Sequence, residues 1–85
     1  GARAALHSRG GSLLPVGVMR VNGTFSRGDV IAVKDEDGVL IARGITSYSS
    51  QEAELTRGMK LDMVGRVVPA LAGVALIHRD ELLVF

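Results

Sequence analysis

Two short patterns in the sequence have the spacing of catalytic or nucleotide-binding motifs, and each lacks residues that its chemistry needs. His78-Arg79-Asp80 matches the start of a protein-kinase catalytic loop, but Phe85 stands where that loop places a metal-binding asparagine. Residues 23–28 have the glycine spacing of a phosphate-binding loop, but Asp29 and Val30 replace the lysine and the hydroxyl residue that should follow. We therefore interpret both patterns as turns and expect no catalytic residue in this chain.

The two histidines are the remaining candidates for chemistry. His7 and His78 have no spacing that is typical of zinc ligands, and the chain has no cysteine. We expect neither a metal site nor a disulfide, with His7 on the surface of a helix and His78 making a hydrogen bond at a strand end. The lack of cysteine also fits a reducing compartment such as the cytoplasm.

Residues suited to binding an anion lie near the start of the chain. Residues 9–12, Arg-Gly-Gly-Ser, place a cation beside free backbone N–H groups, which suit phosphate oxygens. Arg57 and Lys60 flank a later helix junction and could extend this patch. The chain has only three aromatic rings, so base stacking is not expected. With a net charge of +1, RNA binding is permitted but not demanded, and ordinary surface charge explains these cations equally well.

The composition is that of one small globular domain. Of the 85 residues, 47% are apolar and 22% are charged, which argues against disorder. The apolar runs are far shorter than the roughly 20 residues that span a bilayer, so no membrane association is expected. The N-terminus lacks the apolar core of a signal peptide and is interpreted as a cut inside a longer protein.

Turn signals divide the chain into short elements. The predicted helices are at residues 2–8, at 49–58 behind the capping pattern Ser49-x-x-Glu52, and at 62–68 with Asp62 as N-cap and Pro69 as the stop. The predicted extended segments are residues 16–21, 30–34, 39–48, 74–78 and 82–85. Arg43 and Gly44 interrupt the third of them, as at a barrel corner. The pattern predicts a mainly β domain with short helices (α+β), in which five to six short strands close into a barrel.

The motifs in these elements resemble one known family. Residues 11–17, Gly-Ser-Leu-Leu-Pro-Val-Gly, resemble the opening signature of PUA domains. Residues 21–30 then look like the PUA domain carried by bacterial glutamate 5-kinases. Residues 41–45, 48–53 and 76–80 continue this resemblance in register, whereas residues 61–63 and Pro69 depart from the family pattern.

The resemblance implies that residues 1–85 are the C-terminal PUA domain, a PUA-like pseudobarrel, of a longer enzyme. Its N-terminal amino-acid-kinase domain would phosphorylate the γ-carboxylate of glutamate with ATP and Mg²⁺, the first step of proline synthesis. The resemblance implies no cofactor for this chain. The implied partners are its own kinase domain and further copies of the enzyme in a homo-oligomer.

The resemblance also places the PUA ligand surface on this sequence. It falls first on Arg9, Gly11, Ser12, Leu14 and Pro15, and then on Tyr48, Arg57 and Lys60. Structural roles are the alternative: Gly11 allows a turn, Leu14 and Pro15 pack, and Tyr48 covers the end of the barrel. Two other functions are alternatives to a domain of glutamate 5-kinase. One is an RNA-binding PUA domain of an RNA-modifying or ribosome-associated protein, and the other is an interaction module without a ligand.

Overall fold

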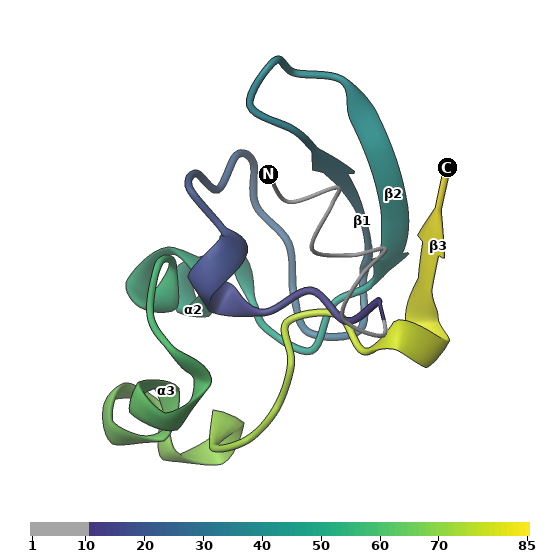
Figure 1. Cartoon of the computed structure of the whole chain (residues 1–85). Helices are drawn as coiled ribbons and strands as arrows, with labels where there is room; N and C mark the ends of the chain where they lie inside the picture. Colours follow the sequence, from purple (N-terminus) through teal and green to yellow (C-terminus); the bar gives the residue numbers. More distant parts are fainter. Residues whose placement is uncertain (1–10) are drawn as a thin grey trace.

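The structure, a computed structural model, describes residues 11–85, which form a small α+β domain. Figure 1 shows the sheet on one side of these residues and the α-helices at the opposite end. The elements are η1 (Pro15–Gly17), β1 (Val30–Lys34), β2 (Leu40–Ile45), α2 (Ser50–Thr56), α3 (Leu61–Val67), η2 (Pro69–Leu71), η3 (Arg79–Glu81) and β3 (Leu82–Val84), where η denotes a 3-10 turn. The helix predicted at residues 2–8 lies outside the described residues.

β1 and β2 form the antiparallel hairpin that the sequence predicts. The β-branched residues of β1 favour extended backbone, and the strand has the predicted bounds. The turn is fixed by Asp35, whose Oδ1 accepts hydrogen bonds from the N–H groups of Asp37 (2.9 Å) and Val39 (3.0 Å). Gly38 supplies the left-handed backbone there, with a φ of 80°.

β2 ends before the predicted residue 48 because the chain after Ile45 bonds to itself. Thr46 Oγ1 accepts a hydrogen bond from the N–H of Tyr48 (3.1 Å) and donates one to its carbonyl oxygen (2.8 Å). Such local bonds compete with the ladder of a sheet. The N–H of Ser47 donates to the carbonyl oxygen of Leu76 (2.8 Å), which ties the end of β2 to a distant segment.

A β-bulge in β2 decides which side chains face the core. The register shifts after Val33, which pairs with Ala42, so Ile41 is an extra residue on β2. Ile41 and Ala42 are both buried, whereas strict alternation along a strand would bury only one of them. The exposed residues of β2 are Leu40, Arg43 and Ile45.

β3 pairs with β2 in antiparallel orientation, and Gly44 lies opposite Leu82. A Cβ atom at position 44 would overlap the carbonyl oxygen of Glu81 and lie 2.8 Å from Ile77 Cγ2. The prediction that Arg43 and Gly44 interrupt the strand is therefore wrong. β2 runs through both residues, and the missing side chain of Gly44 admits the backbone beside it.

Two predicted extended segments are not strands in the described part of the chain. Residues 16–21 begin with the 3-10 turn η1, because Pro15 has no N–H for a ladder and its fixed φ suits a helical turn. Residues 74–78 contribute a single bridge, at Ile77. The α+β class is confirmed, but residues 11–85 form three strands rather than five to six.

The predicted capping box starts α2. Ser49 Oγ accepts from the N–H of Glu52 (3.2 Å), and Glu52 Oε1 accepts from the N–H of Ser49 (2.8 Å). The predicted start of α3 is corrected: the N-cap is Lys60 rather than Asp62, which lies in the first turn. A carboxylate there interacts favourably with the helix dipole. Pro69 follows α3, so the predicted stop is confirmed.

The core combines residues from the sheet, both α-helices and the connecting segments. Its buried apolar members are Leu13, Val33, Ile41, Ala42, Tyr48, Ala53, Val64, Leu71, Leu76 and Ile77. Neither α-helix formed by residues 11–85 has the length and the apolar run needed to cross a membrane.

Candidate binding junction

The glycine-proline segment predicted to bind a ligand is anchored at its first residues. Gly11 has a φ of 84°, so it makes a turn that other residues rarely adopt. Ser12 Oγ accepts a hydrogen bond from the N–H of Arg79 (3.0 Å). Leu13 exchanges backbone hydrogen bonds with Ile77 in both directions, at 2.9 and 3.2 Å. Gly11 and Ser12 therefore lie beside η3.

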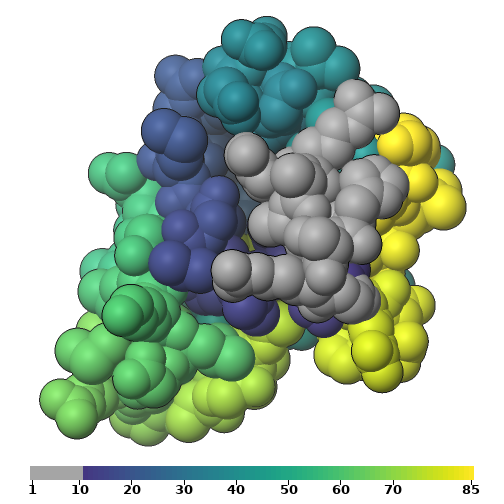
Figure 2. Space-filling view, viewed as in Figure 1, coloured from purple at the N-terminus to yellow at the C-terminus, as the bar shows by residue number. Residues whose placement is uncertain are grey.

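The other end of the segment packs against the turn that follows α2. Pro15 is buried, and its carbonyl oxygen accepts from the N–H of Gly58 (2.8 Å). Arg57 donates through Nη1 to the carbonyl oxygen of Met19 (2.9 Å) and through Nε to Glu54 Oε1 (2.9 Å). In Figure 2 the first described residues, in purple, lie directly against the green helical part. We call Pro15, Met19, Arg57 and Gly58 the η1–α2 junction.

The structure brings some of the predicted ligand residues together and separates others. Gly11 and Ser12 lie beside η3, whereas Pro15 and Arg57 belong to the η1–α2 junction and Leu14 is half-buried next to it. Lys60 is exposed at the start of α3, and Tyr48 is buried. Arg9 lies outside the described residues. Arg57 Nε and Nη1 already donate to Glu54 and Met19, so Lys60 is the more available cation at this end.

Tyr48 supports the fold from the inside. Its side chain is fully buried, and its hydroxyl donates to the carbonyl oxygen of Val74 (2.7 Å). Burial and the neighbouring Glu52 carboxylate both raise the pKa of the Tyr48 phenol above its usual value. An enclosed, neutral and hydrogen-bonded phenol cannot contact a ligand at the surface. This position corrects the prediction that Tyr48 belongs to the ligand surface.

Arg79 is the residue near this site that sequence reasoning missed. Its N–H is bonded to Ser12, 67 positions earlier in the chain, and its side chain is exposed. A local motif cannot reveal this neighbour, because only the pairing of Leu13 with Ile77 brings the two segments together. The interpretation of residues 78–80 as a turn is confirmed: His78 is the N-cap of η3, Arg79 and Asp80 lie in η3, and His78 Nδ1 accepts from the N–H of Asp80 (3.2 Å).

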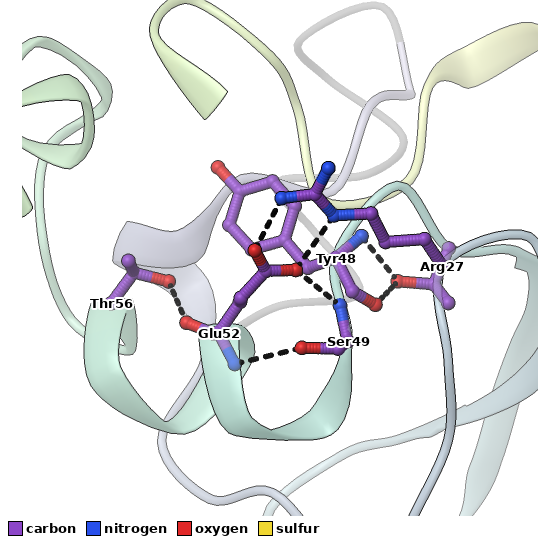
Figure 3. Close-up of polar contacts among 6 residues, drawn as sticks. Arg27, Tyr48, Ser49, Glu52 and Thr56 are labelled. Atoms are coloured by element: carbon purple, nitrogen blue, oxygen red, sulfur yellow. Dashed lines mark hydrogen bonds and ion pairs between the residues drawn. The ribbon is translucent and has the colours of Figure 1, made fainter. Parts of the chain in front are cut away.

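An ion pair between Arg27 and Glu52 ties the loop before β1 to the start of α2 (Figure 3). Arg27 Nε donates to Glu52 Oε1 (2.8 Å), and Nη2 bonds to the second carboxylate oxygen. Oε1 also accepts from the Ser49 N–H of the capping box. The Arg27 guanidinium, helped by Ser49, lowers the pKa of Glu52 from 4.5 to about 2, against the opposing effect of burial.

We expect acid to weaken the domain through Glu52. Its pKa is about 2 when folded and 4.5 in the absence of these contacts, so its contribution to stability is complete above pH 4.5 and is lost as the pH falls towards 2. Urea unfolding of Glu52→Gln across this window should show a shallower loss of stability than the wild type. Glu54→Gln removes the same charge from the same helix, at an exposed ion pair. In this variant the free energy of unfolding should fall with pH as steeply as in the wild type. If the free energy of unfolding fell equally steeply with pH in both variants, the acid sensitivity would not come from Glu52.

The geometry of the site suits contact rather than bond-making chemistry. The hydroxyl of Ser12 accepts from a backbone N–H, and that of Ser49 caps a helix. Among residues 11–85 there is no group of three or more His, Asp or Glu side chains placed to hold a metal ion. What remains at the surface is a fixed turn flanked by exposed cations, Lys60 and Arg79.

A small α+β domain opened by this glycine-proline segment is what the sequence resemblance leads one to expect of a PUA domain. The family model described as the PUA domain matches residues 1–68, which is most of the chain. The chain therefore belongs to the PUA domain family.

Individual relatives narrow the comparison further. The chain is similar to glutamate 5-kinases from Geobacter sp. (strain M21), with 49% identity over 96% of the chain, and from Variovorax paradoxus (strain S110), with 46% identity over 96%. It is 43% identical over 99% of its length to the glutamate 5-kinase of Delftia acidovorans. The predicted resemblance is confirmed. The chain spans 22% of the length of each of these curated relatives.

Proposed function

We propose that this chain is the non-catalytic PUA domain of an enzyme that uses ATP and Mg²⁺ to phosphorylate the γ-carboxylate of glutamate in proline synthesis. The observation that carries the proposal is 43–49% identity to glutamate 5-kinases over 96–99% of the chain. In this cytoplasmic enzyme the domain has a regulatory or assembly role. Its partners are the N-terminal amino-acid-kinase domain of the same polypeptide and further copies in a homo-oligomer. The domain adopts a PUA-like pseudobarrel fold.

The contacts within the domain support a role without catalysis. Ser12 and Glu52 bond to backbone N–H groups, and Glu52 is further held by Arg27, so these polar side chains shape turns and helix ends. A general base needs a free position within reach of the proton it removes. Side chains committed in this way do not provide one.

The test compares the isolated chain with the longer polypeptide that contains it. The adjoining coding sequence should encode an amino-acid-kinase domain, and the longer protein should release ADP when ATP and glutamate are both present. Residues 1–85 alone should release none. An unrelated adjoining domain, or a longer protein whose ATP turnover does not depend on glutamate, would overturn the proposal.

RNA binding is the second candidate, as in a PUA domain of an RNA-modifying or ribosome-associated protein. It is favoured by the exposed cations Lys60 and Arg79, which lie near the two ends of the glycine-proline segment. Titration with a structured RNA over a salt series tests it. The logarithm of the association constant falls linearly with the logarithm of the salt concentration, and each lost phosphate contact makes this fall less steep by about 0.7–0.9. Lys60→Gln should make the fall less steep and Lys34→Gln, on the sheet, should not. No binding at low salt would exclude this function.

A further inference from the structure

The sheet has an exposed face that is mostly apolar. The outer face consists of Val30, Ala32, Lys34, Leu40, Arg43, Ile45, Leu83 and Phe85, all exposed. The pairing places Val30 opposite Ile45 and Leu83 opposite Arg43, so these residues form one continuous surface. Its large apolar side chains are between 40% (Ile45) and 64% (Val30) exposed. Contiguous apolar surface of this kind marks interaction sites more often than single exposed residues do.

Charge on the outer face restricts what can cover it. The Arg43 guanidinium lies over the ring of Phe85, 5.9 Å from its centroid, and Lys34 is the second cation of the face. The ion pairs within residues 11–85 do not include Arg43, and residues 1–10 contain no Asp or Glu. Burying a cation against a purely apolar partner is costly. A partner that covers this face must therefore bring at least one carboxylate.

This charge pattern argues against a second copy of the chain. A two-fold axis through the centre of the outer face would place Arg43 of one copy against Arg43 of the other, with no acidic residue on the face to separate them. RNA is also disfavoured. The one ring of the face, Phe85, is already covered by Arg43, and the other large apolar residues are aliphatic, so bases have little to stack on.

We propose that the outer face is the surface against which the remainder of the longer polypeptide packs, and that this remainder presents an apolar patch with a carboxylate facing Arg43. The occupant rests on the proposed function. It is supported by the length of the relatives, in which the matched segment is 22% of the protein and most of the chain lies elsewhere. An apolar centre with one complementary charge pair is typical of a specific protein interface.

Hydroxyl-radical footprinting of single side chains tests the packing. Leu83 and Phe85, which are 57% and 48% exposed, should react readily in the isolated chain and several-fold more slowly in the longer protein. Met19 and Leu55 are 77% and 59% exposed away from the sheet and should react equally in both. Equal reactivity of Leu83 and Phe85 in the two proteins would overturn the proposal.

A charge reversal tests the role of Arg43. In the longer protein, Arg43→Glu should restore the reactivity of Leu83 and Phe85, whereas Arg66→Glu, an exposed site in α3, should leave their protection intact. Unfolding of each isolated variant checks that it folds, and Leu83→Gln is a second variant that weakens the apolar part of the surface. Protection that survives both outer-face variants would overturn the proposal.

The readouts separate this inference from the proposed function. If Leu83 and Phe85 were protected in the longer protein but ADP release did not depend on glutamate, the kinase assignment would be refuted and the proposed outer-face contact would still be supported. An active kinase without protection would refute the surface alone. Protection of the isolated chain that grows with its own concentration, or on addition of RNA, would assign the outer face to a second copy or to nucleic acid and overturn the proposal.

Discussion

Replacing Gly44 by alanine is expected to lower the free energy of unfolding by about 3 kcal/mol, the upper end of the usual cost of overpacking. The new Cβ atom would overlap the carbonyl oxygen of Glu81 and lie 3.1 Å from Leu82 Cα. These atoms belong to the backbone, so they cannot rotate away as a flexible side chain would. Relief requires β3 to separate from β2. Urea unfolding monitored by circular dichroism measures the loss.

Gly17→Ala is the matched control for this prediction. A Cβ atom at position 17 would have no neighbour within 4 Å, and its φ is not among the positive ones. The substitution should change the free energy of unfolding by no more than about 0.5 kcal/mol. If Gly44→Ala were equally mild, the close contact between β2 and the start of β3 would be wrong.

Truncating Tyr48 to alanine is expected to cost about 3–5 kcal/mol, as for other large buried rings. Its ring is fully enclosed in the core, and a small domain cannot refill the space without moving its sheet against its helices. Because small domains are stabilised by only about 5 kcal/mol or little more, a large part of the Tyr48→Ala protein should be unfolded in buffer. Thermal unfolding followed by far-ultraviolet circular dichroism, whose signal comes from the backbone and does not depend on Tyr48, would show this.

Tyr48→Phe separates the ring from its hydroxyl. It keeps the packing but leaves the carbonyl oxygen of Val74 without its hydrogen bond, at a cost of about 1–2 kcal/mol. The phenylalanine variant should therefore unfold cooperatively at an intermediate denaturant concentration. A loss as large as that of Tyr48→Ala would mean that the hydroxyl, rather than the ring, dominates the contribution of this residue.

The parts of the fold that the sequence predicts well are those with a local cause. The Ser49–Glu52 capping box, the hairpin turn and the stop at Pro69 each depend on residues a few positions apart. The start of α3 was misplaced because Asp62 is equally suited to the first turn of a helix and to its N-cap. The bulge at Ile41 has no sequence signal, since two neighbouring apolar residues are compatible with several registers.

The candidate site was predicted less completely because its contacts are distant in sequence. The segment from Gly11 to Pro15 could be recognised as a unit, but its neighbours, Arg79 and Gly58, are supplied by tertiary packing. The resemblance places Tyr48 on the ligand surface, and no local pattern predicts its burial and its bond to Val74. The outer face was also missed, since the alternation of β2 is broken at the bulge and Phe85 joins Arg43 only through the pairing of β3 with β2.

The bridge between Leu13 and Ile77 has a consequence for the order of events during synthesis on the ribosome. The β1–β2 hairpin joins residues close in sequence and can form while later residues are still in the exit tunnel. The segment around Leu13 emerges much earlier than its partner and must wait, without its backbone bonds, until residue 77 has left the ribosome. The first described residues therefore join the fold late in synthesis, and a nascent chain arrested before residue 77 should leave the segment around Leu13 open to proteases.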